Sequence, residues 1–259
     1  MKKIFITGSR SGIIKNVYDK LSCDEYFIYA SVHTLKEKER LQEIYKERKN
    51  IQILKLDLTN KNDILSVKNL DIDILILNAA YGFSSPIFNM DMSKLREIYE
   101  VNIFGNVLLL QNILNNMITK NNGKIILISS IIGLAPIEFL SGYASSKSAI
   151  LTIGLCLKKE LKLMNKNIKV KIVEPGVFKT GFNEMMLTSN DLDGYSNREK
   201  RKIKLKEFFI FDFLAKKNLE GISKTIIKAI NSNSNRLVYS YPKFEKIYAK
   251  IYQVFKYWV

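Results

Sequence analysis

Cysteine and histidine are scarce in this sequence, which has two cysteines, Cys23 and Cys156, and a single histidine, His33. Two cysteines without metal-ligand spacing give no disulfide framework and no metal site, so the cysteine usage indicates a reducing compartment. One histidine nearly excludes catalytic schemes that depend on a histidine base. No apolar run reaches the roughly 18 residues of a membrane span, and residues 1–9 fit a strand better than a signal peptide. We therefore expect a cytoplasmic protein.

Acidic residues are also in deficit, because 25 Asp and Glu stand against 41 Lys and Arg and leave a net charge of +16. Such a charge suits an anionic partner. The lysines are dispersed, however, and no nucleic-acid motif accompanies them, so we predict no nucleic-acid binding. With 47% hydrophobic and 25% charged residues, the 259-residue chain is ordinary globular material. It most simply forms one domain, residues 1–259.

Apolar runs alternate with amphipathic segments along the chain. The pattern predicts strands at residues 3–7, 26–31, 51–56, 72–77, 124–128 and 168–173, with a seventh at 237–240. Helices are predicted at residues 13–21, 34–48, 95–119, 142–164 and 219–230. This alternation predicts an α/β fold with a Rossmann-type, doubly wound parallel sheet of about seven strands. Ligands bind at the carboxyl ends of the strands in such sheets, so polar groups that follow the strands should converge there.

A glycine-bearing turn, Gly8-Ser9-Arg10-Ser11-Gly12, connects the first predicted strand to the first predicted helix. A strand, a glycine-rich turn and a helix in this order let backbone N–H groups and a helix N-terminus meet a phosphate. The turn by itself does not distinguish such a site from an ordinary strand–helix connection.

Tyr143 and Lys147 lie four residues apart at the start of a predicted helix, and Ser130 follows a predicted strand. A phenol has a pKa of about 10 and needs a nearby cation to favour phenolate, a role that Lys147 is placed to fill. Ser130 could then hydrogen-bond a carbonyl or hydroxyl that Tyr143 protonates or deprotonates. The same spacing recurs at Tyr45/Lys49, Tyr239/Lys243 and Tyr252/Lys256, where a solvated helix pair is the ordinary interpretation.

Taken together, these motifs resemble the short-chain dehydrogenase/reductase family in its single-domain form. The matching residues, in order over about residues 3–180, are Thr7-Gly8-x-x-x-Gly12, Asp57, Asn78-Ala79, Asn102, Ser130, Tyr143-x-x-Ser146-Lys147 and Pro175-Gly176. The resemblance implies a Rossmann fold, a nicotinamide dinucleotide, and hydride exchange with an alcohol or a carbonyl.

The resemblance also implies residue roles. Tyr143 is the general acid/base, Lys147 lowers its pKa and holds the nicotinamide ribose, Ser130 orients the substrate oxygen, and Asn102 holds a water. Asp57 would contact the adenine amine, Asn78 the adenosine ribose region and Thr180 the carboxamide. Asp57 could instead cap the following helix, and Asn78 and Asn102 could be structural hydrogen-bonders. The full set of implied cofactor contacts is Thr7, Gly8, Ser9, Arg10, Ser11, Gly12, Ile13, His33, Asp57, Leu58, Asn78, Ala79, Tyr143, Lys147, Pro175, Gly176, Val177 and Thr180.

Two positions depart from the family pattern. Ile14 stands where the family has a third glycine, which allows close packing of helix on strand, and Ala80 replaces a usual glycine. Either the turn shifts to accept Ile14 or cofactor affinity drops. This departure motivates a rival interpretation, a non-catalytic dinucleotide-binding sensor or scaffold. An epimerase or dehydratase with the same catalytic residues is a third class, against which the length of the chain counts.

The end of the second predicted strand bears on the cofactor. An NAD enzyme would place an acid there, whereas this chain has Ser31-Val32-His33-Thr34. With no carboxylate to repel a 2′-phosphate, and with Arg10, His33 and Lys36 within plausible reach, we predict NADP(H) rather than NAD(H).

The remaining segments bear on substrate and partners. Residues 178–219 are predicted to form a substrate lid, in which Phe208, Phe209, Phe211 and Phe213 beside basic residues suit an apolar carbonyl or alcohol, although an ordinary lid would also fit. Residues 242–259 form a basic aromatic tail of the kind that contacts membranes peripherally, and a partner-subunit surface would look the same. The family resemblance further suggests a homodimer or homotetramer through the two long helices.

Overall fold

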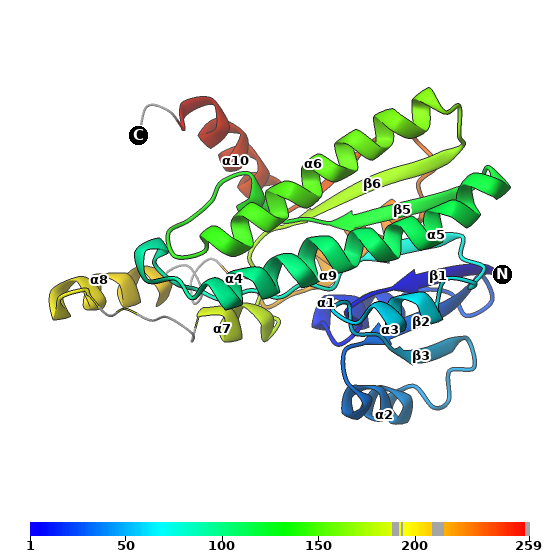
Figure 1. Ribbon diagram of the computed structural model, residues 1–259, viewed down its shortest axis with the longest axis horizontal. Helices are drawn as coiled ribbons and strands as arrows, with labels where there is room; N and C mark the ends of the chain where they lie inside the picture. Colours follow the sequence, from blue (N-terminus) through cyan, green and yellow to red (C-terminus); the bar gives the residue numbers. More distant parts are fainter. Residues whose placement is uncertain (188–191, 193, 209–214, 257–259) are drawn as a thin grey trace.

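The computed structural model describes residues 1–187, 192, 194–208 and 215–256. Seven parallel strands form one sheet in the order β3-β2-β1-β4-β5-β6-β7 (Figure 1). The strands are β1 (Lys2–Ile6), β2 (Tyr26–Val32), β3 (Ile51–Lys55), β4 (Ile74–Leu77), β5 (Gly123–Ile128), β6 (Ile168–Pro175) and β7 (Val238–Tyr241). The predicted Rossmann-type sheet is therefore confirmed.

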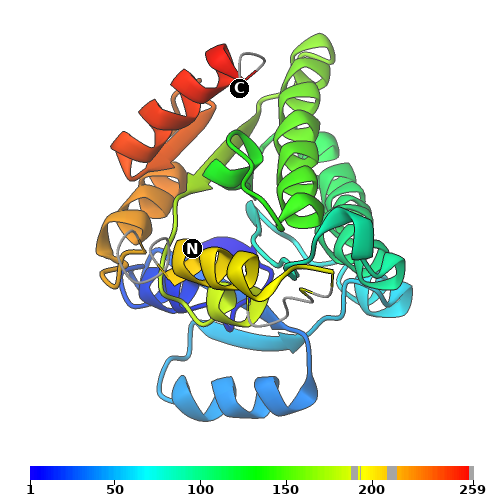
Figure 2. The ribbon, with the colours of Figure 1, turned by 90° about the vertical axis from the view of Figure 1, so that its left-hand side faces the viewer.

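Helices cover both faces of the sheet, as Figure 2 shows from the end of the molecule. The α-helices are α1 (Gly12–Tyr18), α2 (Leu35–Ile44), α3 (Lys61–Ser66), α4 (Met92–Tyr99), α5 (Asn106–Lys120), α6 (Ser141–Leu163), α7 (Phe182–Leu187), α8 (Asn197–Phe208), α9 (Glu220–Asn231) and α10 (Lys243–Phe255). Two 3₁₀ turns, η1 (Ile87–Asn89) and η3 (Ile131–Gly133), and a π-helical segment, η2 (Glu100–Gly105), complete the described elements.

The aliphatic strands explain why both faces are covered. All residues of β4 and β5 are buried, which is the pattern of strands enclosed on two sides. One core lies where α1, α2 and α9 meet the sheet, and it includes Ile14, Leu41 and Ile226. The other lies under α3, α5 and α6, and it includes Ile64, Ile113 and Leu157. The sheet is therefore packed between two layers of helices, which fix the positions of the carboxyl ends of its strands.

The long helix predicted at residues 95–119 is present as an unbroken helical stretch of α4, η2 and α5, and its middle segment, η2, is π-helical, which the prediction did not include. Asn102, in the π-helical segment, accepts a hydrogen bond from the backbone N–H of Tyr81 at 2.7 Å and donates one to the Tyr81 carbonyl at 2.9 Å. Gly105, at the end of the segment, lies so close to the Leu58 carbonyl that an added Cβ would overlap it. A single π-helical turn inside a helix often marks a functional site.

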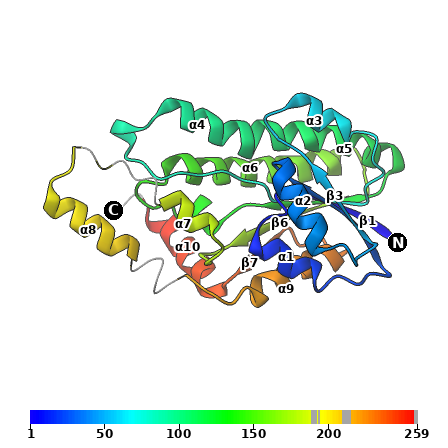
Figure 3. The same cartoon turned by 90° about the horizontal axis from the view of Figure 1, so that it is seen from below.

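The predicted lid, residues 178–219, contains α7 and α8. An isolated parallel β-bridge pairs Phe178 near its beginning with Lys216 near its end. Phe209, Phe211 and Phe213 lie outside the described residues, as does the side chain of Phe208. Figures 1 and 3 both show α8 at the end of the molecule toward which the strands run. Most of the basic aromatic tail forms α10. None of the described helices combines the length and apolar composition needed to cross a membrane.

Candidate active site at the carboxyl edge of the sheet

A cavity of about 690 Å³ opens at the carboxyl ends of the strands. Most of the residues singled out in the sequence line it, and they come from the carboxyl end of a strand or from the turns and helices that follow six strands. These residues are Thr7, Gly8, Arg10, Ser11, Ile13, His33, Asp57, Leu58, Asn78, Ala79, Ser130, Tyr143, Lys147, Pro175, Gly176, Val177 and Thr180. Three others, Ser9, Gly12 and Asn102, are not among the lining residues of the described chain. The expected convergence therefore occurs, with these exceptions.

The glycine turn holds the end of β1 against the end of β4. Gly8 has a φ of +68°, and a Cβ placed there would lie 2.7 Å from the Cα of Ala79, so only glycine fits without displacing the neighbouring chain. The Thr7 hydroxyl accepts hydrogen bonds from the N–H groups of Asn78 and Ala79, both at 2.9 Å. The Asn78 amide donates to the carbonyls of Thr7 and Gly8. Asn78 therefore shapes the cavity wall as a structural hydrogen-bonder.

Ser9 was predicted to contact the cofactor, but it does not line the cavity. Its side chain is fully buried, where the hydroxyl donates to the Ile6 carbonyl and accepts from the Tyr18 hydroxyl. Ser9 therefore anchors α1 on the sheet. Gly12 begins α1 beside Leu219, away from the cavity lining.

Ile14 does not obstruct the cavity. It is fully buried and belongs to the core cluster that includes Ile6 and Ile28. The side chain that lines the cavity from this turn of α1 is its neighbour Ile13. The Ile14 side chain therefore packs into the core instead of crowding the glycine turn, and it does not occupy the cavity.

Ser130, Tyr143 and Lys147 meet in the cavity and are each less than 10% exposed, at 7%, 8% and 4%. The Lys147 ammonium donates to the Ile128 carbonyl at 2.9 Å and lies 5.6 Å from the centroid of the Tyr143 ring. The Ser130 hydroxyl accepts from the Ile132 N–H at 3.2 Å and donates to the Pro175 carbonyl at 3.4 Å. Two hydroxyls and an ammonium thus share one buried wall.

Burial governs the titration of this group. It raises the pKa of Tyr143 above the ordinary phenol value, and hydrogen bonding to Ser130 only partly opposes it. Burial lowers the pKa of Lys147 to about 8. The net pKa of Tyr143 is thus raised in the protein alone, and the lowering by Lys147 that the resemblance implies stays a prediction. At neutral pH Tyr143 is a protonated phenol, which is the form that donates a proton.

Asn102 lies outside the cavity lining and contacts residues that support the site. Besides its bonds to Tyr81, its amide donates to the Ser146 hydroxyl at 2.9 Å, and the side chain is 1% exposed. Its amide oxygen and nitrogen are thus engaged by protein groups. Asn102 ties the loop after β4 to the helix bearing Tyr143 and Lys147, and the water-holding role that the resemblance implies for it stays a prediction.

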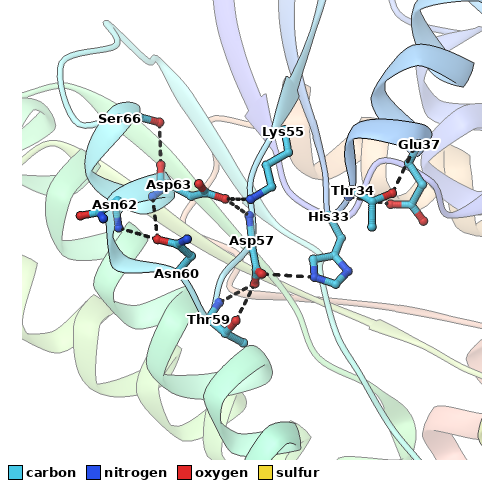
Figure 4. A network of polar contacts seen from close by, with 10 residues as sticks. All are labelled: His33, Thr34, Glu37, Lys55, Asp57, Thr59, Asn60, Asn62, Asp63 and Ser66. Atoms are coloured by element: carbon cyan, nitrogen blue, oxygen red, sulfur yellow. Dashed lines mark hydrogen bonds and ion pairs between the residues drawn. The ribbon is translucent and has the colours of Figure 1, made fainter.

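The adenosine end that the sequence predicts carries paired charges, shown in part in Figure 4. Asp57 lies 3.3 Å from the His33 Nε2 and accepts hydrogen bonds from the backbone and side chain of Thr59. Burial raises the pKa of Asp57, but the bonds from Thr59 and the His33 charge outweigh it, so this pKa is lowered overall. Asp57 lines the cavity as well as shaping its own turn. The cap of the following helix is Asn60, not Asp57.

Arg10 and Glu37 form an ion pair at 3.0 Å, and both line the cavity. Glu37 also completes the capping box of α2 with Thr34, which is the only role that the sequence indicated for it. A carboxylate therefore does face this end of the cavity, contrary to the expectation that none would. Lys36 is exposed and absent from the described lining residues.

Apolar side chains surround the catalytic end. Ile132, Ile137, Phe178 and Phe182 line the cavity, and the Phe182 ring lies 5.6 Å from the Tyr143 ring. No local motif in the sequence indicated these residues, because only the tertiary fold brings α7 and η3 to Tyr143. Among the described residues, no group of His, Cys, Asp or Glu could hold a metal ion.

The fold and these residues are those of a dinucleotide-binding protein with a buried serine, tyrosine and lysine at the carboxyl edge of its sheet. The family model for short chain dehydrogenase matches residues 2–190. The chain belongs to the short-chain dehydrogenase/reductase family, whose members are NAD(P)-dependent oxidoreductases acting on CH–OH and C=O groups.

Similar proteins span different substrates and cofactors. Human retinol dehydrogenase 8 is 28% identical over 194 residues, which cover 72% of this chain and 62% of that protein. The chain thus matches about three fifths of that relative's length. A Burkholderia phymatum short-chain dehydrogenase/reductase in complex with NAD is 14% identical, with a TM-score of 0.82 and coverage of 98% of this chain and 93% of the other. A Sphingobium yanoikuyae short-chain dehydrogenase in complex with NADPH is 17% identical, with a TM-score of 0.75 and coverage of 99% and 96%. These two likenesses concern the fold.

The cavity fits a nicotinamide dinucleotide. Gly8, Ser11 and Ile13 line the cavity where the glycine turn meets the start of α1, where a pyrophosphate is favoured. Tyr143, Lys147 and Val177 line the opposite end. A nicotinamide bound there supplies or accepts the hydride, while the side chains supply position and a proton.

Proposed function

We propose that this protein is an NADP(H)-dependent oxidoreductase that exchanges a hydride with an apolar carbonyl or alcohol substrate. The observation that carries the proposal is the buried meeting of Ser130, Tyr143 and Lys147 in a cavity of dinucleotide size. Ser130 holds the substrate oxygen by a hydrogen bond, and Tyr143 donates its proton to that oxygen during reduction. In the reverse direction the phenolate accepts the proton, with the Lys147 ammonium nearby to stabilise its charge.

The apolar substrate is supported by the side chains around Tyr143. Ile132, Ile137, Phe178 and Phe182 line this end of the cavity, and the Ser130 and Tyr143 hydroxyls are placed among them to orient an oxygen. A substrate with one polar oxygen on an apolar body leaves few unpaired polar groups in such a site.

The preference for NADP(H) is supported by Arg10 and His33, which line the adenosine end. Glu37 pairs with Arg10, and Asp57 lies 3.3 Å from the His33 Nε2, so a 2′-phosphate has to compete with two carboxylates. Titration of the protein with NADPH and NADH, followed by nicotinamide fluorescence, tests the preference directly. Tighter binding of NADH would contradict it.

The proton-transfer role is tested by replacing Tyr143 with Phe. Turnover of an apolar carbonyl panel should fall by roughly 10²- to 10⁴-fold, while NADPH binding is retained because the ring remains. Undiminished turnover would overturn the role of Tyr143. The rival interpretation as a non-catalytic sensor rested on Ile14, and its place in the core removes that support. Tight NADPH binding without oxidation across the panel would restore the rival.

Self-association through the long helices is part of the proposal. Phe104 in η2 and Leu155 in α6 are apolar and 57% and 39% exposed, and we propose that a second copy covers them. Light scattering after size-exclusion chromatography should give the mass of a dimer or tetramer. A monomer at all concentrations would contradict this.

A further inference from the structure

A stripe of large apolar side chains runs along α10. Six of its residues are more than half exposed, namely Phe244 at 54%, Ile247 at 59%, Tyr248 at 63%, Ile251 at 54%, Val254 at 68% and Phe255 at 57%. At about 100° per residue, these six positions fall within an arc of about 120° on one side of the helix. We call these residues the outer stripe.

The opposite side of α10 fastens the helix to the protein. Ala249 is fully buried and packs with Ile131 and Ala135. Lys246 pairs with the buried Glu174, and Gln253 donates to the Leu134 carbonyl. Figure 2 shows α10 at the margin of the molecule, where it can turn one side inward and the other outward. The outer stripe therefore points away from the fold to which the helix is attached.

The charges around the outer stripe are positive. Lys243 and Lys250 are exposed beside it, whereas the acidic residue of α10, Glu245, is turned inward to the Val177 N–H at 3.2 Å. Arg198, Arg201, Lys202 and Lys204 are exposed on α8, which lies at the same end of the molecule as the later turns of α10 (Figures 1 and 3). Two copies of the outer stripe facing each other would bring these positive charges together, whereas an anionic surface would attract them.

We propose that the outer stripe docks peripherally on a membrane surface that carries anionic lipid. A helix with an apolar side and flanking lysines lies in the plane of the interface, with the apolar side among the acyl chains and the lysines at the headgroups. Each lysine near an anionic surface adds to the attraction, and salt weakens it. The proposal concerns binding alone, so it stands or falls separately from the oxidoreductase activity.

Flotation of the full chain with lipid vesicles tests the docking. The protein should float with vesicles of phosphatidylcholine mixed with phosphatidylglycerol, and less with phosphatidylcholine alone. An Ile247→Glu/Ile251→Glu variant should lose at least about tenfold in apparent affinity for the mixed vesicles. The matched control is Leu35→Glu/Leu163→Glu, which places the same charges on residues of α2 and α6 that are 63% and 85% exposed. This control should float like the wild type.

The charge contribution has its own variant, Lys243→Gln/Lys250→Gln, which should also weaken binding to the mixed vesicles while leaving the outer stripe intact. Circular dichroism confirms that each variant is folded. Failure of the wild type to float, or equal flotation of the Ile247→Glu/Ile251→Glu variant and its control, overturns the proposal. A variant that changes the oligomeric state without any vesicle binding by the wild type assigns the outer stripe to a second copy and likewise overturns it.

Discussion

Glu245 accepts a hydrogen bond from the backbone N–H of Val177, with the carboxylate oxygen 3.2 Å from the nitrogen. The same oxygen lies so close to Gly176 that an added Cβ would overlap it. Pro175, Gly176 and Val177 line the cavity, and Glu245 belongs to the last helix of the chain. The wall at the nicotinamide end is therefore held in place from outside by α10.

Replacing Glu245 with Ala should loosen this wall and raise the KM for the cofactor several-fold, with a smaller effect on kcat at saturating cofactor. Loss of the acceptor leaves the Val177 N–H unpaired in a part-buried place, which costs about 1–3 kcal/mol. Steady-state kinetics with varied NADPH measure the effect. Glu43→Ala on α2, where the carboxylate is exposed and pairs only with Lys46, is the control. An unchanged KM in Glu245→Ala would contradict the positioning role.

Asn102 should matter for both stability and rate. An Asn102→Ala variant leaves the N–H and carbonyl of Tyr81 without their partners, so the free energy of unfolding should fall by about 2–4 kcal/mol. We also expect a lower kcat, because the helix that bears Tyr143 loses its tie to the loop after β4. Urea denaturation and turnover are measured together. Asn115→Ala, at an exposed position of α5, should change neither, and a matching loss there would show that the effect is not specific.

The charge on Glu37 should influence the choice of cofactor. Replacing Glu37 with Gln removes the partner of the Arg10 guanidinium but keeps a side chain that can complete the capping box with Thr34. The freed arginine should bind a 2′-phosphate better, so the ratio of NADPH to NADH affinity should rise by about tenfold. Glu39→Gln, which lies two residues further along α2 and is exposed, is the control. An equal gain for NADPH and NADH in Glu37→Gln would contradict the interpretation.

The residues that could be predicted from the sequence are those whose position depends on local chain geometry. Aliphatic runs such as Ile74–Leu77 indicated the strands, and the order of a parallel sheet brings residues such as Asn78 and Ser130 to one edge. The π-helical segment could not be predicted, because it depends on a long-range bond between Asn102 and Tyr81. The pairing of Arg10 with Glu37 likewise requires the tertiary approach of the glycine turn to α2. The orientation of the Ser9 side chain also could not be predicted, because it depends on how α1 packs and brings the Tyr18 hydroxyl to it.

The buried ammonium of Lys147 should make stability depend on pH. Burial lowers its pKa to about 8, so between about pH 8 and the pKa of about 10.4 in an unfolded chain the unfolded state binds more protons. In that window the contribution of Lys147 to stability therefore rises with pH. Relative to a Lys147→Met variant, the wild type should gain about 2 kcal/mol in the free energy of unfolding between pH 8 and pH 10. Urea titrations of both proteins measure the difference, and a constant difference over this range would contradict the lowered pKa.

Substitution of Ile14, at the position where the family has a glycine, should affect stability and leave cofactor binding unchanged. Its side chain is fully buried among Ile6, Val17 and Ile28, so an Ile14→Ala variant should lower the free energy of unfolding by about 2–5 kcal/mol. The affinity for NADPH should stay unchanged, because the cavity is lined by Ile13 and not by Ile14. An Ile13→Ala variant gives the opposite expectation, with a smaller loss of stability and a changed affinity. A rise in NADPH affinity in Ile14→Ala would mean that the isoleucine does reach the dinucleotide site.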